Sequence, residues 1–148
     1  MIFGFLLFML FMALILALWE IQIEGGDGWA AKLPAWRLER PWVLRLTGGR
    51  PLTGYHVFMT VFLLAVVHLP LFFVPWSWRL ESLLLGFYVG MVLLEDFLWF
   101  AFNPHYGIKN FRREKIWWHR QWWGPIPGLY YILSVIAAFL IYFGRVAL

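Results

Sequence analysis

Four apolar stretches alternate with polar segments along the chain. They cover residues 2–19, 55–74, 80–102 and 128–143. Because an α-helix rises about 1.5 Å per residue, roughly 20 apolar residues cross the ~30 Å hydrocarbon core of a bilayer. The pattern predicts an all-α integral membrane protein with four transmembrane helices. No internal repeat or domain boundary is visible, so residues 1–148 are expected to form a single four-helix transmembrane domain.

The first stretch has a cleaved signal peptide as its alternative interpretation. A signal peptide begins with a basic region and ends at a cleavage site such as Ala-x-Ala. Residues 2–19 carry no charge, and no Ala-x-Ala sequence follows them. Trp19 stands where an aromatic anchor meets the lipid headgroups. We therefore expect a transmembrane helix here.

The composition agrees with a membrane location. Hydrophobic residues make up 63% of the chain and charged residues 14%, whereas about 25% of the residues of a typical soluble domain are charged. The chain contains no cysteine. Disulfides and thiolate metal sites are thereby excluded, and any metal would need oxygen and nitrogen ligands.

The basic residues predict the orientation. Residues 20–54 and 103–127 form two long segments that hold five Lys and Arg each, while residues 75–79 and the C-terminal tail hold one each. Cytoplasmic loops carry the basic excess, so both long loops are expected in the cytoplasm and both termini outside, in a prokaryotic cytoplasmic membrane. Gly and Pro interrupt the first loop, which favours short interfacial helices.

Two adjacent acidic residues, Glu95 and Asp96, lie near the end of the third apolar stretch. An acidic side chain at the centre of a membrane helix costs roughly 2.5–3.5 kcal/mol, so such a pair needs hydrogen-bond partners, water or a metal. The predicted orientation brings the polar residues at the loop ends of the other helices to the same depth. Glu20 and Glu24 would share one helix face if the first helix continues through Ile23.

A divalent metal, with Fe, Mn, Mg and Zn all admissible, is one interpretation of this set. Carboxylates and imidazoles that project into a four-helix bundle bind such ions. The candidate ligands are Glu95, Asp96, His105, His119, Glu20 and Glu24, and the further polar candidates are His56, Asn103 and Asp27. Neither Glu-x-x-His nor His-Glu-x-x-His occurs. A metal-free proton-handling site and purely structural hydrogen bonding therefore remain open.

The aromatic and basic loops have the composition of a surface that contacts anionic lipid. We expect lipid or anion contacts at Arg37, Arg40, Arg112 and Arg113. The combined hypothesis is a small membrane protein whose cytoplasmic-side carboxylate and histidine site binds or acts on a lipid-soluble or anionic substrate. The alternative is a non-catalytic subunit or assembly factor of a membrane complex. Whether the chain is an enzyme stays open, and we expect no nucleic-acid partner.

Small residues recur every four positions in the third stretch, at Ser82, Gly86 and Gly90. Such a stripe lets two helix backbones approach closely in lipid. It favours either close packing within the chain or contact with a second copy in a homo-oligomer.

Residues 24–32, Glu-Gly-Gly-Asp-Gly-Trp-Ala-Ala-Lys, resemble the first half of the CDP-alcohol phosphotransferase motif, Asp-x-x-Asp-Gly-x-x-Ala-Arg. Glu24 replaces the first Asp, and Lys32 replaces Arg. In that family the acidic residues bind divalent metal for lipid headgroup transfer, so the resemblance implies metal-binding roles for Glu24 and Asp27. The second half of the motif, a Gly and two further Asp at spacings of four, is absent, and the family has more membrane spans.

Overall fold

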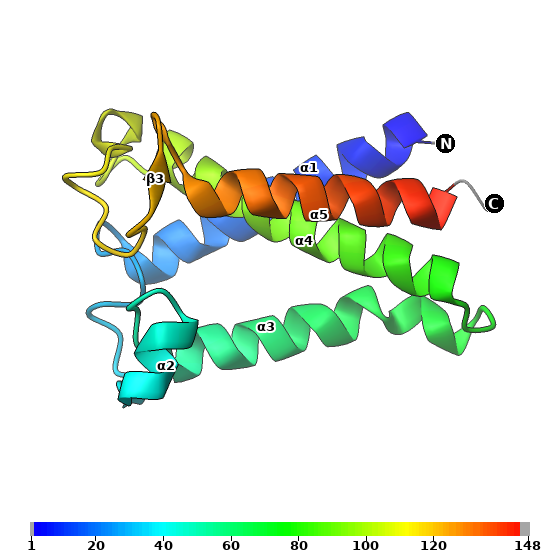
Figure 1. The fold of residues 1–148 in the computed structure, drawn as a ribbon, viewed down its shortest axis with the longest axis horizontal. Coiled ribbons are helices and arrows are strands. Elements are labelled where there is room, and N and C mark those ends of the chain that lie inside the picture. The colour runs from blue at the N-terminus through cyan, green and yellow to red at the C-terminus, as the bar shows by residue number, and fades with distance from the viewer. Residues whose placement is uncertain (1, 146–148) are drawn as a thin grey trace.

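The computed structural model describes residues 2–145, which are mostly helical. The long helices run along the length of the molecule, with the start of the first and the end of the last at one end and the long loops at the other (Figure 1). We call the latter the loop end. The helices are α1 (Ile2–Glu24), α2 (Pro41–Leu46), α3 (Gly54–Val67), α4 (Trp78–Phe102) and α5 (Gly128–Arg145).

Three of the helices, α1, α4 and α5, are long and apolar enough to cross a membrane. This is compatible with an integral membrane protein. The helix α3 has 14 residues, about 21 Å at 1.5 Å per residue, and is shorter than the sequence predicts. It ends at His68, and a 3-10 turn over Leu69–Phe72 follows, with Pro70 near its start. Because proline lacks an N–H group, it cannot continue the α-helical hydrogen bonding.

The helix α1 continues beyond the predicted span as far as Glu24. It ends at Gly25, whose φ of 63° lies in the left-handed region that favours glycine after a helix. The apolar residues Ile21 and Ile23 carry the helical pattern across this extra turn. Glu20 and Glu24 consequently lie one turn apart on the same buried face.

The helix α4 is the centre of the packing and contacts α1 and α5 along its length, whereas it makes few contacts with α3. The small-residue stripe is used inside the chain. A Cβ atom at Gly86 would lie 2.8 Å from Ile141 Cγ1 in α5, and one at Gly90 would lie 2.7 Å from Met9 Sδ in α1. Both glycines therefore permit the close approach of neighbouring helices.

Two small antiparallel β pairs stand at the loop end, one before α3 and one before α5. The first joins β1 (Arg37–Leu38) to β2 (Leu52–Thr53), and the second joins β3 (Trp122–Trp123) to β4 (Ile126–Pro127). The long loops also contain α2 and a 3-10 turn, η2 (Ile108–Asn110).

The two β pairs connect to their helices in the same way. The N–H of Gly54 donates to the carbonyl of Trp36 at 2.9 Å, and the N–H of Gly128 donates to the carbonyl of Gln121 at 2.9 Å. In each case the donor is the first helical residue and the acceptor precedes the first strand. The chain thus contains two successive units of helix, long loop, β pair and helix, a repeat that the sequence analysis does not detect.

The close contact between α4 and α5 generates a prediction for Gly86→Ala. The added methyl group would lie 2.8 Å from Ile141 Cγ1 and 3.0 Å from the Ile141 backbone nitrogen, so α5 must shift. We expect a loss of about 1–3 kcal/mol in stability, measured as a lower midpoint of thermal unfolding in detergent. Gly4→Ala is the matched control, since nothing lies within 4 Å of its added Cβ. Equal midpoints for the two variants would contradict this packing.

Candidate functional site

A cavity of about 460 Å³, which we call the inner cavity, lies where the long helices meet the loop end. Its polar lining combines four acidic side chains with two histidines, an arginine and a tyrosine: Glu20, Glu24, Glu95, Asp96, His56, His119, Arg50 and Tyr130. Acidic residues come from α1 and α4, and the other groups come from α3, α5 and the loops. The cavity therefore joins all four long helices through titratable side chains.

Glu20 and Glu95 form a carboxyl pair between α1 and α4. Their side chains are in hydrogen-bonding contact, and the Tyr55 hydroxyl donates to Glu20 Oε1 at 3.0 Å. The two residues are only 7% and 5% exposed. Two buried carboxyl groups in contact avoid repulsion when they share one proton. Glu95 Oε1 is buried, and no donor group of the described residues reaches it.

Glu24 is held by a turn of the first loop. Its Oε1 accepts the N–H of Ala30 at 2.5 Å, and both Trp29 and Ala30 adopt positive φ angles, 60° and 49°. Non-glycine residues rarely occupy this region and do so at a cost of about 1–3 kcal/mol each. The turn brings Trp29 into a stack on the His56 ring, with centroids 4.1 Å apart. The backbone strain thus positions both a carboxylate partner and an aromatic wall.

Asp96 forms a second polar unit with His119 and Tyr130. His119 Nε2 lies 3.1 Å from Asp96 Oδ2, and the Tyr130 hydroxyl donates to the same oxygen. The His119 side chain is 4% exposed and that of Asp96 is 30% exposed, and both line the inner cavity. A carboxylate that fixes an imidazole in this way is the arrangement by which a histidine is oriented for proton transfer.

Arg50 supplies the fixed positive charge of the inner cavity. Its Nε donates to the Thr47 carbonyl at 2.9 Å, and its guanidinium lies over the Trp29 ring at 4.3 Å. Burial lowers the pKa of the Arg50 guanidinium from its ordinary value, yet an arginine starts from so high a value that it stays charged at pH 7.

An aromatic cluster closes the inner cavity at the loop end. Trp99, Phe100 and Trp118 belong to it, and the rings of Phe100 and Trp118 stack with centroids 5.9 Å apart. A Cβ atom at Gly28 would overlap the Trp118 ring, so glycine is required there. Trp99 Nε1 is buried without a hydrogen-bond partner. This N–H group therefore has no acceptor among residues 2–145.

Apolar side chains from α3, α4 and α5 also line the inner cavity. They are Val57, Met59, Val61, Val92, Leu93, Leu129 and Leu133. The polar and apolar linings occupy one continuous space. Such a cavity fits a molecule with a polar end and an apolar body.

Six of the residues singled out from the sequence come together here: Glu20, Glu24, His56, Glu95, Asp96 and His119. The other three lie elsewhere. His105 is exposed, and Asn103, which caps α4, accepts its backbone N–H at 2.9 Å. Asn103 also donates to the Gly25 carbonyl at 2.6 Å and so ties α4 to the end of α1. Asp27 pairs with Lys32 at 2.9 Å near the surface.

The arginines predicted to contact lipid or anions lie outside the inner cavity. Arg37 donates to the Ala30 carbonyl, and Arg40, Arg112 and Arg113 are exposed. Their contacts with lipid stay a prediction.

Among residues 2–145, no group of three or more histidine, aspartate or glutamate side chains is arranged to hold a metal ion. The contacts explain this geometry. Glu24 is engaged by a backbone N–H, and Asp96 is engaged by His119 and Tyr130. The divalent metal expected from the sequence therefore stays a hypothesis.

Sequence reasoning did not identify Tyr55, Tyr130, Arg50 and Trp99 as members of the site. The two tyrosines carry a signal that could have been noticed. Each lies in the first helical turn behind a short Pro-Leu-Thr-Gly or Pro-Ile-Pro-Gly sequence, and each hydroxyl reaches a carboxylate on the preceding long helix.

The chain matches no protein-family model, and neither a curated protein nor a solved structure is similar enough to match it. The nine-residue resemblance to CDP-alcohol phosphotransferases thus has no family match beside it.

The Asp96 unit generates a prediction for Tyr130→Phe. The variant keeps the ring but removes the hydroxyl that donates to Asp96. Hydrogen bonds to charged groups contribute about 1.5–3 kcal/mol, so we expect a lower thermal unfolding midpoint in detergent. Tyr131→Phe is the control, because Tyr131 is 42% exposed at the adjacent position and should tolerate the same change. A midpoint that stays at the wild-type value in Tyr130→Phe would show that the bond does not stabilise the fold.

Proposed function

We propose that the chain is an integral membrane protein that binds a lipid-soluble molecule in the inner cavity and transfers protons to or from its polar end. In this proposal α3 and the 3-10 turn after it form the fourth membrane crossing. The long loops, the acidic cluster and the polar end of the bound molecule lie on the cytoplasmic side, because the basic excess of the loops favours that orientation.

The observation that carries the proposal is a pair of buried, unpaired polar atoms that belong to residues lining an amphipathic cavity. Glu95 Oε1 and Trp99 Nε1 are both buried without partners and belong to residues that line it. A buried polar atom without a hydrogen bond costs about 1–3 kcal/mol. A hydroxyl or amide group on the bound molecule both donates and accepts, so it would supply a donor for Glu95 Oε1 and an acceptor for Trp99 Nε1.

The packing of α3 supports entry from the bilayer. It contacts α4 only sparsely and barely touches α5, while Val57, Val61 and Leu133 from these two helices line the same cavity. A molecule dissolved in the bilayer can pass between α3 and α5 without crossing the charged loop end. Its apolar body would then remain against the apolar lining.

Two polar units support proton transfer at the bound end. The imidazole of His119, oriented by Asp96, is a proton acceptor. The Glu20 and Glu95 pair is a proton donor when the two carboxyl groups share one proton. With both units on one cavity, the reaction class that fits is general acid–base chemistry on a lipid-soluble substrate.

The test is to place a larger side chain in the apolar lining of the inner cavity through the substitution Leu133→Trp. The wild type, purified in mild detergent, should release a lipid-soluble molecule on extraction with organic solvent, identified by mass spectrometry. Retention in Leu133→Trp should fall about tenfold, which corresponds to about 1.4 kcal/mol. Ile136→Trp adds the same group at an exposed position of α5, 41% accessible, and should retain the molecule. Equal retention in both variants, or nothing extracted from the wild type, would contradict the proposal.

A divalent cation in the inner cavity is the second candidate, favoured by the excess of negative charge. Four acidic side chains and one arginine line this cavity, and Glu95 Oε1 has no hydrogen-bond partner among the described residues. This hypothesis predicts stoichiometric metal in elemental analysis of the purified protein and its loss in Glu95→Gln. Glu81→Gln, near the other end of α4, should keep the metal. Metal-free wild type after growth with Fe, Mn, Mg and Zn would exclude the candidate.

A further inference from the structure

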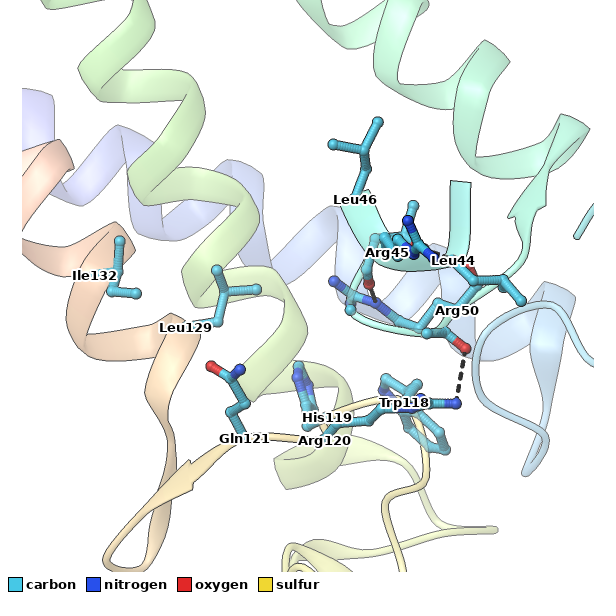
Figure 2. A pocket seen from close by; sticks show the side chains of 13 residues that line it. Leu44, Arg45, Leu46, Arg50, Trp118, His119, Arg120, Gln121, Leu129 and Ile132 are labelled. Carbon is cyan, nitrogen blue, oxygen red and sulfur yellow. Dashed lines mark hydrogen bonds between the residues drawn. The ribbon is translucent and has the colours of Figure 1, made fainter. Parts of the chain in front are cut away.

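A second pocket of about 620 Å³ adjoins the inner cavity at the loop end (Figure 2). We call it the outer pocket. It is lined by Leu44–Arg50, which include the end of α2 and the turn after it, by Trp118–Gln121, and by Leu129 and Ile132 of α5. Figure 2 shows Arg45 and Arg50 on the α2 side and Leu129 and Ile132 across from them on α5.

The outer pocket is positively charged. Its lining includes Arg45, Arg50 and Arg120 and no aspartate or glutamate. A guanidinium has five N–H donors, and few of these are used. Within residues 2–145, Arg120 donates to the Gly49 carbonyl at 3.3 Å, Arg50 donates to the Thr47 carbonyl, and Arg45 makes no hydrogen bond or ion pair. Most of the N–H donors of Arg45 and Arg120 therefore have no partner among the described residues, while Arg50 also lies over Trp29.

The turn after α2 is built to bring these arginines together. Gly48 and Gly49 have φ angles of 69° and 90°, which only glycine adopts readily. A Cβ atom at Gly49 would overlap the Arg120 guanidinium. Glycine at this position thus lets a side chain from the second long loop lie against the backbone of the first.

A phosphate group matches this arrangement. Planar guanidinium groups bind phosphate oxygens through paired N–H donors, and phosphate offers enough oxygens and charge for several of them. Three arginines line this pocket and no carboxylate lines it with them. Arg50 also lines the acidic inner cavity, whereas Arg45 and Arg120 do not. A single carboxylate ligand would engage only one such fork.

The apolar surroundings indicate that the phosphate belongs to a lipid. In α2, Trp42 is 60% exposed and Leu46 is 80% exposed, on either side of Arg45 in the sequence. Across the pocket, Ile132 is 44% exposed on α5. Basic and apolar side chains combined in this way lie at the level of lipid headgroups. A phosphate at that depth would leave its chains along α5.

We propose that the outer pocket binds the phosphate group of a membrane lipid. The outer pocket and the inner cavity share Thr47, Arg50, Trp118, His119 and Leu129, so the atoms next to the phosphate reach the mouth of the inner cavity. The substrate class is then a phosphate-bearing lipid, a conclusion that rests on the proposed function. Phosphate binding is inferred only from the residues of the outer pocket and does not depend on the proposed function.

The experiment compares three probes with the detergent-purified full chain: dioctanoyl phosphatidic acid, dioctanoylglycerol and inorganic phosphate. Binding is measured by native mass spectrometry for the lipids and by competition for inorganic phosphate. We expect the phosphatidic acid to bind at least about tenfold more tightly than the diacylglycerol, and its binding to weaken between about 0.1 and 0.5 M salt. Equal binding of the two lipids would overturn the proposal.

The variant is Arg45→Gln combined with Arg120→Gln, both at exposed positions. The matched control is Arg112→Gln with Arg113→Gln, which removes the same charge from exposed positions outside the pocket. Phosphatidic acid affinity should fall about tenfold or more in the first double variant and hold in the second. An equal loss in both would show only general attraction to a basic surface and would overturn the proposal.

Inorganic phosphate distinguishes the two sources of the group. Weak competition, at a concentration far above that of the lipid, supports a lipid headgroup whose chains contribute to binding. Competition as strong as that of the lipid would overturn the lipid assignment and leave a site for free phosphate. Leu133→Trp should leave the affinity for inorganic phosphate unchanged, because Leu133 lines the inner cavity and not the outer pocket. The Leu133→Trp variant therefore tests the proposed function, and the arginine variants test phosphate binding in the outer pocket.

Discussion

Carboxyl side chains from α1 and α4 meet inside an apolar helix bundle. Much of the loop structure serves to give these buried groups hydrogen-bond partners. A charge that leaves water loses several kcal/mol of solvation unless it gains partners. The partners are specific: Tyr55 for Glu20, the Ala30 N–H for Glu24, and His119 with Tyr130 for Asp96. Almost all of them come from the loops or from the first turns of α3 and α5. The loop end is therefore organised around the acids rather than merely connecting the helices.

In each of the two units of helix, loop, β pair and helix, a tyrosine hydroxyl binds a buried carboxylate, but the two units pack differently. Tyr55 in α3 reaches back to Glu20 in α1, and Tyr130 in α5 reaches back to Asp96 in α4. The second pair of helices packs closely, with Gly86 against α5. The helix α3 stands apart from its neighbours. The inner cavity is the space that this difference leaves, and its polar end is fixed by the shared tyrosine arrangement.

Charge is divided between the two adjoining spaces. The inner cavity is lined by four acidic residues, and the outer pocket is lined by three arginines and no acidic residue. Arg50 and His119 line both and mark the boundary. A phosphate-bearing lipid fits this division, with its anionic group among the arginines, its neighbouring polar atoms near the acids and its chains along α5. The proposed function and the lipid assignment thus rest on two adjoining pockets that share lining residues.

Position along the helix axes is what the sequence determined. Hydropathy and chain length place α1, α4 and α5, and they bring Glu20, Glu24, Glu95 and Asp96 to one level, because position along a helix follows directly from residue number. The exposure of His105 and the tyrosine partners of the carboxylates were decided by the tertiary structure. So was the grouping of Arg45, Arg50 and Arg120 on one pocket. Loop folding and the rotation of each helix about its axis depend on contacts between distant residues, such as Asn103 with Gly25, and no local pattern contains them.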